Sequence, residues 1–290
     1  MKKISYSQLS LYNECPHHWK LRYIDKIRTM ESSIHLIFGS AMHTTLQIYL
    51  DKMYRESIKN ANELNLGKIL QEELIKEFKG AKEKDKKDPC TKNEINEFFD
   101  DGLGIIEWFK KRRSSYFKKQ NWELLGCEIP LDVELKNNIR FIGYMDVVLR
   151  HIPTNRIKII DIKTSSWGWN KYQKADKIKT AQLPLYKRYY QEVYGIPVKH
   201  IDVRYTIVKR KVNENAEYPA MRSRIQSFSP ASGTPTLSKL EFHLKEFIED
   251  CFVEGTNIYQ QKEYIKNAST KNCKWCPFKD KPDLCDRNKK

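Results

Sequence analysis

One apolar run, RIKIIDIKT at residues 156–164, constrains the fold of this chain more strongly than any other segment. Its β-branched residues predict a strand, and the side chains of a strand point alternately to the two faces of a sheet. Asp161 and Lys163 therefore share one face of a strand that is apolar enough to be buried. Two buried charges cost several kcal/mol each unless a partner compensates them. They form either a structural ion pair at the end of a strand or part of a metal site.

The elements around this run predict an α/β fold, with a central mixed sheet flanked by helices. The expected strands cover residues 124–135, 139–150, 156–164 and 200–211, with a short strand near 222–228. The expected helices cover residues 5–27 with a break at Cys15-Pro16, a stretch that opens at Gly39-Ser40, much of 55–120, then 175–194 and 238–261. We expect a single domain over residues 1–290, with a helical insertion at 44–120.

A turn signal at residues 153–155 joins two of these strands into a hairpin. If residues 152–155 form a four-residue loop, Asp146 lies directly opposite Asp161. Opposed residues of an antiparallel pair face the same side of the sheet, with Cβ atoms about 5 Å apart. Two carboxylates this close repel each other unless a cation lies between them. An oxygen-rich site of this kind suits Mg²⁺ or Mn²⁺.

The charge balance favours a polyanionic partner, because 53 Lys and Arg against 37 Asp and Glu give a net charge of +16. Nucleic acid is the simplest such partner, and the alternative is that an AT-rich genome has enriched the chain in Lys without any binding role. The basic start of the chain lacks the apolar stretch of a signal peptide, and no run approaches the ~18 apolar residues of a membrane span. We expect no membrane contact and a reducing cytoplasm.

The cysteines point to a metal rather than to disulfides, because seven are too few for a disulfide scaffold of this length. Cys273, Cys276 and Cys285 form C-x2-C-x8-C; a C-x2-C pair is common in zinc knuckles, but three cysteines need a fourth ligand. Cys15 is the best candidate for it. Like Cys276 it precedes a proline, and Cys-Pro recurs in iron–sulfur ligand runs. Both zinc and iron–sulfur therefore fit these residues.

Five short motifs follow one another along the chain. They are SYSQLSLYNECPHHWKLRY (5–23), GSAMH (39–43), GYMD (143–146), DIKT (161–164) and QLPLY (182–186). Together they resemble the RecB-like branch of the PD-(D/E)XK nuclease superfamily. The resemblance implies a restriction-endonuclease-like core and metal-dependent cleavage of DNA. Some members carry Glu four residues after the histidine of the second motif, whereas this chain has Gln47.

The resemblance also implies which residues hold the Mg²⁺ or Mn²⁺ ion. They are His43, Asp146, Asp161 and the backbone carbonyl of Ile162. A metal in this position can activate water and neutralise phosphate charge. Taken alone, His43 lies on the apolar side of its helix, so the alternative for this residue is a buried histidine of the core.

Three further residues complete the expected catalytic group with the two aspartates. Lys163 can orient the nucleophile or stabilise the charge that develops on phosphate. Gln182 and Tyr186, four residues apart, share one helix face and can contact the site or the scissile backbone. For Tyr186 the alternative is a packing role.

Aromatic and basic residues near the candidate site can bind the substrate. Trp167, Trp169 and Tyr172 directly follow the strand that carries Asp161 and Lys163, and stacking of aromatic side chains on bases is worth roughly 1–3 kcal/mol per base. The alternative for the tryptophans is packing in the core. A phosphate track can involve the basic residues Lys209, Arg210, Lys211, Arg222 and Arg224, although a solvated surface is the alternative for each.

Members of this branch, such as the AddB nuclease domain and CRISPR-associated exonucleases, use four cysteines to bind a [4Fe–4S] cluster. The resemblance implies such a cluster at Cys15, Cys273, Cys276 and Cys285, where it clamps residue 15 to the segment 265–290, and zinc is the alternative.

The expected function is a cytoplasmic deoxyribonuclease in a bacterial or phage-infected cell. It acts as an exonuclease on single strands or DNA ends, in recombination, repair or replication and with protein partners from those processes. The alternatives are a DNA-binding subunit with an inactive or incidental nuclease site and an RNA nuclease.

Overall fold

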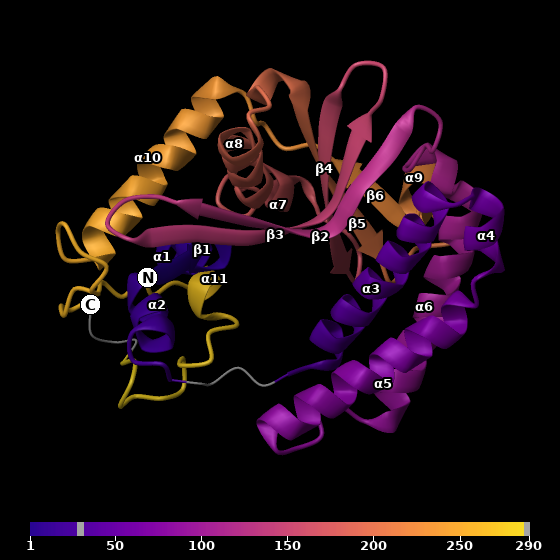
Figure 1. Ribbon diagram of the computed structural model, residues 1–290. Coiled ribbons are helices and arrows are strands. Elements are labelled where there is room, and N and C mark those ends of the chain that lie inside the picture. Colours follow the sequence, from indigo (N-terminus) through magenta and orange to yellow (C-terminus); the bar gives the residue numbers. More distant parts are fainter. Residues whose placement is uncertain (28–31, 287–290) are drawn as a thin grey trace.

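The computed structural model describes residues 1–27 and 32–286 of the chain (Figure 1). Within these residues, a mixed six-stranded sheet lies between helices on both of its faces, which confirms the predicted α/β fold. The strands are β1 (Lys2–Ser5), β2 (Trp122–Glu134), β3 (Ile139–His151), β4 (Arg156–Ser165), β5 (Ile201–Lys209) and β6 (Ile225–Phe228). No helix in the described part of the chain is both long and apolar enough to cross a membrane.

Each face of the sheet has its own apolar core, which we call the first and the second core. The first core lies between the sheet and α1 (Tyr6–Glu14), α2 (Pro16–Tyr23), α8 (Gln182–Tyr194) and α10 (Thr234–Cys251). The second core lies between the sheet and α3 (Ile34–Arg55), α4 (Ile58–Glu63), α5 (Leu66–Asp85) and α6 (Lys92–Arg112). The short helices are α7 (Lys171–Ala175), α9 (Pro219–Arg222), α11 (Thr270–Cys273), η1 (Arg113–Ser115) and η2 (Val198–His200).

Strand β3 organises the sheet, because β2 follows one of its edges while β1 and β4 share the other. β1 runs parallel to residues 139–142, and β4 runs antiparallel to residues 147–151. His151 lies opposite Arg156, so the register predicted from the four-residue loop is confirmed. Residues 143–146 lie in the fork between β1 and β4, where this edge of β3 has no strand partner among the described residues.

The side chains of β3 change sides of the sheet at this fork. Phe141 and Met145 lie in the first core, but Val147, two residues after Met145, lies in the second core. A regular strand would keep alternate residues on one side, so the alternation is broken at Asp146. The facing strand is irregular at the same level, because Glu128 of β2 has a φ of 52°, in the left-handed region. Irregularities of this kind re-aim side chains and are common beside active sites.

Two helix boundaries differ from those expected at the sequence level. Helix α3 begins at Ile34 rather than at Gly39, because the apolar turn that contains Ile34 and Phe38 is buried in the second core and extends the helix backwards. Helix α10 spans Thr234–Cys251 rather than 238–261, and it begins with a proline in its first turn, where the missing N–H costs no hydrogen bond.

The helix expected over 175–194 begins only at Gln182, as α8, and a loop separates it from the short helix α7, which ends at Ala175. The carboxylate of Asp176 accepts hydrogen bonds from the backbone N–H groups of Ile178 (3.1 Å) and Lys179 (3.0 Å). Such local bonds offer the backbone an alternative to the helix. Tyr6 of α1 then donates to the carbonyl oxygens of the same two residues at 3.1 and 2.9 Å, which fixes this loop in front of α8.

The two ends of the chain lie side by side (Figure 1). The N–H of His17 donates to the carbonyl of Ile265 at 3.2 Å, and the side chain of Asn272 donates to the carbonyl of Glu14 at 2.9 Å. These bonds join α1 and α2 to the segment that leads into the three C-terminal cysteines.

The first turn of α6 is closed by a capping box, which gives a stability prediction. The Thr91 hydroxyl accepts from the N–H of Glu94 at 3.2 Å, and the Glu94 carboxylate accepts from the N–H of Thr91 at 2.8 Å. We expect Thr91→Ala to lower the free energy of unfolding by about 1 kcal/mol, because it removes the cap oxygen. Denaturant titration measures this loss. Thr91→Ser keeps the oxygen and should cost clearly less, so equal losses for the two variants would contradict the capping role.

Candidate metal centre and catalytic site

The carboxylate of Asp146, on β3 at the fork in the sheet, contacts two other elements. Its Oδ2 accepts a hydrogen bond from the N–H of Ile162 in β4 at 2.6 Å. The same oxygen lies 2.7 Å from Nε2 of His43 in α3. Only 8% of Asp146 is exposed, so this carboxylate is held inside the protein by β4 and α3 together. His43 and Asp146, which are 103 residues apart, therefore meet as the motif order predicted.

Asp161 and Lys163 form the buried pair that the sequence indicated. Asp161 is 1% exposed, and Nζ of Lys163 lies 3.0 Å from each of its carboxylate oxygens. Burial and then the nearby charge of Asp146 raise the pKa of Asp161 to about 7. Burial by itself lowers the pKa of Lys163, but the two aspartates outweigh it and raise that pKa above its ordinary value. The carboxylates of Asp146 and Asp161 are thus close together, and the ammonium group of Lys163, on a partly exposed side chain, lies next to Asp161.

One oxygen of Asp161 accepts no hydrogen bond among the described residues, and this observation fits a cation. Lys163 donates a hydrogen bond to Oδ1, whereas the buried Oδ2 lies 3.0 Å from the same ammonium nitrogen but accepts no hydrogen bond within residues 1–27 and 32–286. The single ammonium group compensates only part of the cost of burying two nearby carboxylates. A divalent ion next to Asp146 and Asp161 would supply the missing partner and relieve their repulsion.

Glu128 is a site residue that sequence reasoning missed. Its Oε1 lies 3.5 Å from Nδ1 of His43 and accepts a 2.7 Å hydrogen bond from Gln47. His43, Glu128 and Asp146 offer ligand atoms within 4.8 Å of one another, the single such group of three or more His, Cys, Asp or Glu residues in the described part of the chain. A carboxylic acid between Cys127 and Ile129 in an apolar strand was the available signal.

Two motif glycines allow the motifs to pack against one another. A Cβ atom on Gly143 would lie 2.6 Å from Cε1 and 2.7 Å from the hydroxyl oxygen of Tyr186, so the ring of Tyr186 occupies the space that a side chain would need. A Cβ atom on Gly39 would lie 3.1 Å from Oγ1 of Thr164. The lack of a side chain at Gly39 of GSAMH leaves room for Thr164 of DIKT. In the same way, Gly143 of GYMD leaves room for Tyr186 of QLPLY.

Gln182 and Tyr186 lie on one face of α8, directed toward the same region. The Gln182 amide donates to the Tyr186 hydroxyl at 3.1 Å, and Tyr186 is 5% exposed. Burial raises the pKa of Tyr186, and the charges of Asp161 and Lys163 also act on it. Tyr186 is thus both a packing residue of the first core and a neighbour of the buried pair. Its hydroxyl is held as a hydrogen-bonding group near the aspartates.

The aromatic residues after β4 separate into two kinds. Trp167 is 68% exposed and Tyr172 is 72% exposed, so both present their rings to solvent. Trp169 is 9% exposed and packs on Tyr205, with ring centroids 4.9 Å apart. Its backbone N–H donates to Oε1 of Gln226 at 2.9 Å. Trp169 is therefore a core residue, as the packing alternative required, and is not available for stacking on bases.

Two of the basic residues considered for a phosphate track are bound to α6. Arg210 is paired with Glu97 at 2.9 Å and with Asp101 at 2.5 Å, and Lys211 lies 3.0 Å from each of these carboxylates. This network joins the end of β5 to the helical segment. Because both charges are neutralised within the protein, Arg210 and Lys211 are structural residues here.

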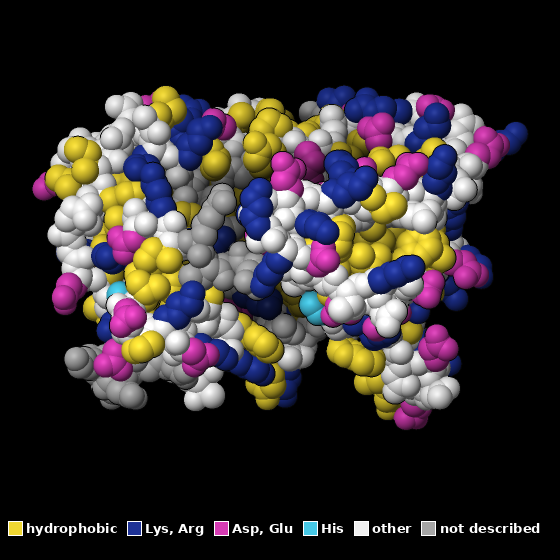
Figure 2. All heavy atoms as spheres, turned by 90° about the horizontal axis from the view of Figure 1, so that it is seen from below, with side chains coloured by type: hydrophobic (Ala, Val, Ile, Leu, Met, Phe, Trp, Pro, Cys, Tyr) yellow, Lys and Arg dark blue, Asp and Glu magenta, His cyan; other side chains and the backbone are white. Residues whose placement is uncertain are grey.

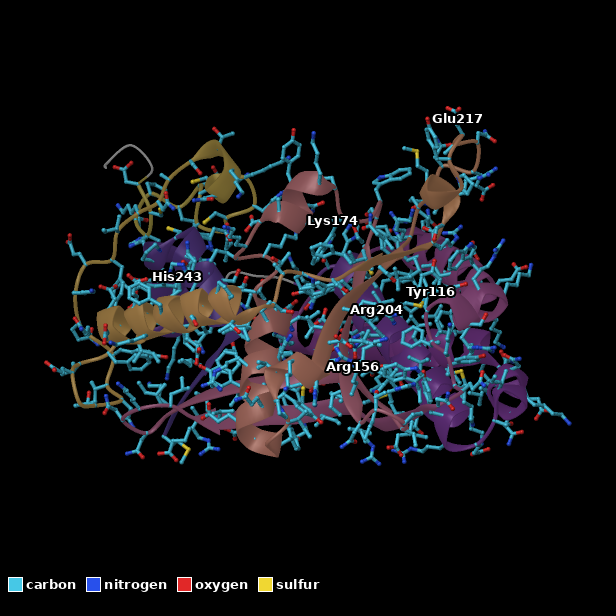
Figure 3. All side chains as sticks on the ribbon, turned by 90° about the horizontal axis from the view of Figure 1, so that it is seen from above. Tyr116, Arg156, Lys174, Arg204, Glu217 and His243 are labelled. Carbon is cyan, nitrogen blue, oxygen red and sulfur yellow. The ribbon has the colours of Figure 1, made fainter. Side chains whose placement is uncertain are left out.

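The other three differ in exposure. Lys209 is buried and donates to the Met221 carbonyl at 3.2 Å, and Arg224 donates to the Arg210 carbonyl at 2.6 Å. Arg222, at the end of α9, is exposed. In Figure 3, α7, which carries Lys174, and the segment before α9, which contains Glu217, project from the same edge of the molecule. Tyr172 and Arg222 therefore belong to two separate projections at this edge.

The four cysteines expected to bind a cluster lie at the joined ends of the chain. None of the seven cysteines, all of which are described, forms a disulfide. Burial and then the charges of Cys285, Cys15 and Cys273 raise the pKa of Cys276, whose Sγ lies 3.9 Å from Nδ1 of His18. Their ligand atoms do not form a group as tight as that of His43, Glu128 and Asp146 within residues 1–27 and 32–286.

Basic side chains are also present on the molecular surface. Figure 2 shows Lys and Arg side chains spread over the face seen from below, several of them near its middle, with Asp and Glu side chains among them. A basic face of this kind attracts a polyanion and makes its binding dependent on salt.

Comparisons with known proteins agree with this geometry. A family model described as the PD-(D/E)XK nuclease superfamily matches residues 3–281, which is nearly the whole chain. No curated protein gives a significant match.

Proposed function

Because this chain belongs to the PD-(D/E)XK nuclease superfamily, we propose that it is a divalent-metal-dependent deoxyribonuclease. A nuclease of this superfamily acts on nucleic acid, and the finer assignment rests on the site itself. The observation that carries it is the buried carboxylate of Asp161, which lies near Asp146, pairs with the Lys163 ammonium group and has one oxygen that accepts no hydrogen bond among the described residues. This arrangement is costly for stability and has the charges that phosphodiester hydrolysis needs.

His43, Asp146, Asp161 and the Ile162 carbonyl are the proposed metal ligands. Their imidazole and oxygen donors fit Mn²⁺ and Mg²⁺. When bound, the ion lowers the pKa of water and neutralises charge on the phosphate. Asp146 is oriented for this by the N–H of Ile162, which holds its Oδ2 at 2.6 Å. Asp161 is oriented by Lys163 in the same way.

Lys163, Gln182 and Tyr186 are the proposed catalytic partners of the two aspartates. The Lys163 side chain is 36% exposed, so its ammonium group can contact both Asp161 and a phosphate arriving from solvent. Placed there, it stabilises the charge that develops on the phosphate oxygens. The Tyr186 hydroxyl, which accepts from Gln182, can donate its own hydrogen to the scissile backbone.

Single-stranded DNA or a DNA end is the proposed substrate, cut exonucleolytically. Trp167 and Tyr172 support it, because exposed aromatic rings that follow a catalytic strand provide stacking surfaces for unpaired bases. The exposed Arg222, at the end of α9, and the partly buried Arg224 support phosphate binding at that edge of the molecule.

We expect Trp167→Ala and Tyr172→Ala each to weaken single-stranded DNA binding by roughly 1–3 kcal/mol, with little effect on duplex binding. Fluorescence anisotropy with labelled oligonucleotides, in Ca²⁺ or EDTA to prevent cleavage, measures both affinities. Phe242→Ala is the matched control, because Phe242 is 57% exposed on α10 at a distance from this loop in the fold. Equal losses for single strands and duplexes would contradict base stacking.

A [4Fe–4S] cluster bound by Cys15, Cys273, Cys276 and Cys285 is the proposed second cofactor, with a structural role. The hydrogen bonds between the chain ends and the mutual influence of the four thiols support it. Tetrahedral zinc, with Zn–S bonds of about 2.3 Å, needs its ligand atoms closer together than a four-iron cluster does. We propose the cluster over zinc because Cys15 and Cys276 each precede a proline, as cysteines in iron–sulfur ligand runs do.

Colour and metal content test this cofactor. Anaerobically purified protein is expected to be brown and to contain iron and sulfide, and Cys15→Ser should lose both the colour and much of the stability, because the cluster joins the two ends of the chain. Cys90→Ser serves as the control. Colourless wild-type protein with stoichiometric zinc would establish the zinc alternative.

The proposed setting is a RecB-like nuclease of recombination, repair or replication in a bacterial or phage-infected cytoplasm, with protein partners from those processes. The order of the five motifs supports this assignment.

An assay on end-labelled substrates tests the proposed function. Purified protein is incubated with single-stranded DNA, duplex DNA and RNA of the same sequence, with Mg²⁺, Mn²⁺ or EDTA. Shortening of the DNA strands from an end, dependent on the divalent ion, is the expected result. Preferential cleavage of RNA would replace the proposal with an RNA nuclease. Tight DNA binding without cleavage under any of these conditions would indicate a DNA-binding subunit.

A further inference from the structure

The two ring nitrogens of His43 face two different carboxylates. Nε2 lies 2.7 Å from Oδ2 of Asp146, on the side where the metal is proposed. Nδ1, on the other edge of the ring, lies 3.5 Å from Oε1 of Glu128. An imidazole that binds a metal through one nitrogen must carry its hydrogen on the other, and that hydrogen needs an acceptor.

Glu128 is held in its place by several features of the fold. Gln47, one turn after His43 in α3, donates at 2.7 Å to Oε1 of Glu128 and at 3.0 Å to the backbone carbonyl of Asp146. Gln47 is 8% exposed, so its amide has few alternatives to these acceptors. Glu128 itself has a φ of 52°, a conformation that costs energy for a residue with a side chain. A costly backbone conformation combined with a partly buried hydrogen bond suggests that the direction of the Glu128 side chain matters.

We propose that Glu128 is a positioning residue that accepts the Nδ1 hydrogen of His43 and thereby directs the Nε2 lone pair toward the metal. Gln47 holds Glu128 in this role. The proposal rests on the proposed function, since it requires a divalent ion at Asp146 and Asp161. In this proposal Glu128 is not itself a metal ligand, although the Glu128 carboxylate is near enough to Asp146 for that role.

The identity of residue 47 agrees with this assignment. The amide nitrogen of Gln47 serves two acceptors, the Glu128 carboxylate and the Asp146 carbonyl. A glutamate at this position would have no hydrogen to give to either acceptor and would repel Glu128. Gln47 therefore suits a site in which the second carboxylate comes from β2 rather than from α3.

Metal binding to the Glu128→Gln variant is the experiment that tests the proposal. Isothermal titration with Mn²⁺ is expected to give a 10–100-fold loss of affinity with the number of bound ions unchanged, which is typical of removing a carboxylate that orients a histidine ligand. Nitrogen-15 NMR of the Mg²⁺-loaded protein should show the Nδ1 hydrogen of His43 in wild type and faster exchange of that hydrogen in Glu128→Gln. Thermal unfolding of the metal-free variant should match wild type, because the Glu128 side chain is 48% exposed.

Two further variants complete the design. Gln47→Leu should reduce Mn²⁺ affinity in the same direction, since it releases Glu128. Glu123→Gln is the matched control on β2, because Glu123 is half-exposed and pairs with Arg150 away from the site, and it should leave metal binding unchanged.

Each remaining outcome has a definite consequence. Unchanged Mn²⁺ affinity in Glu128→Gln would overturn the positioning role while leaving the proposed function intact. Loss of a carboxylate ligand in the Mn²⁺ electron paramagnetic resonance spectrum would also overturn it, by making Glu128 a ligand. If wild-type protein binds no divalent ion, the proposed function fails and this proposal fails with it.

Discussion

Replacing Asp161 with Asn is expected to abolish metal-dependent cleavage while leaving the protein at least as stable as wild type. The amide side chain would keep the shape of the carboxylate but lose the charge that we propose binds the ion. Because Asp161 is 1% exposed and its pKa is raised to about 7, its charged form is a burden on folding at neutral pH. Lys163 is 36% exposed on its side chain and can turn toward water when its partner is lost.

Replacing Lys163 with Met is expected to lower the cleavage rate by about 10²–10³-fold, as removal of one charge-stabilising group does in other enzymes. Its effect on stability should have the opposite sign to that of Asp161→Asn, since Lys163→Met leaves a buried carboxylate next to Asp146 without its ammonium partner. Single-turnover cleavage assays and denaturant titration of both variants measure the two effects. An active site explains this pattern, whereas a purely structural ion pair predicts that both variants lose stability and keep activity.

Asp202→Asn is the matched control for these two variants. Asp202 forms an ion pair with Arg156 at 2.7 Å between neighbouring strands β5 and β4, but it lies at the other end of β4 from Asp161. Its side chain is 46% exposed, so the substitution should change stability by less than about 1 kcal/mol and leave cleavage intact. Cleavage by Asp161→Asn at the wild-type rate would eliminate the proposed catalytic role of this strand.

Replacing Gly143 with Ala is expected to lower the free energy of unfolding by about 1–3 kcal/mol, the usual cost of overpacking a core. The new Cβ atom would lie 2.6 Å from Cε1 and 2.8 Å from Cζ of Tyr186, and the Tyr186 ring is too deeply buried to turn away. Cleavage should fall as well, because either α8 or β3 must shift, and β3 carries Asp146 three residues later.

A double-mutant cycle identifies the contact responsible. In a Tyr186→Leu background the ring atoms near position 143 are gone, so Gly143→Ala should cost much less there, with a coupling energy in the range of 0.5–3 kcal/mol. Gly80→Ala is the control, since a Cβ atom at Gly80 in α5 would have no neighbour within 4 Å. It should stabilise the helix by roughly 0.5–1 kcal/mol. Additive effects at positions 143 and 186 would show that the ring does not require the glycine.

Much of the sheet structure near the site could be predicted from residues that are close together in the sequence. Loop length alone predicted that His151 lies opposite Arg156, because a hairpin register is set by the turn that closes it. Alternation along β4 predicted that Asp161 and Lys163 share a face, and they form an ion pair. The helix boundaries were less accurate, as at Ile34 and Gln182, because a buried apolar turn and an aspartate-centred loop override helical periodicity.

Glu128 illustrates why the rest of the site was not predictable. Its approach to His43 depends on an irregularity of β2 between Leu124 and Gly126 and on its own left-handed backbone. Neither feature has a signal in the alternation of residues, since a strand without them would send Glu128 elsewhere. The ion pairs of Arg210 could not be predicted either, because its acidic partners belong to α6, more than a hundred residues earlier in the chain.

The sequence by itself determined the class of fold, the hairpin register and the identity of a charged pair inside an apolar strand, because these depend on neighbours within a few residues. Only the tertiary structure decided which acid joins His43, which basic residues are neutralised and which tryptophan stays exposed. Those outcomes depend on how α3, α6 and β2 pack across the sheet, and packing joins residues whose separation along the chain leaves no local pattern.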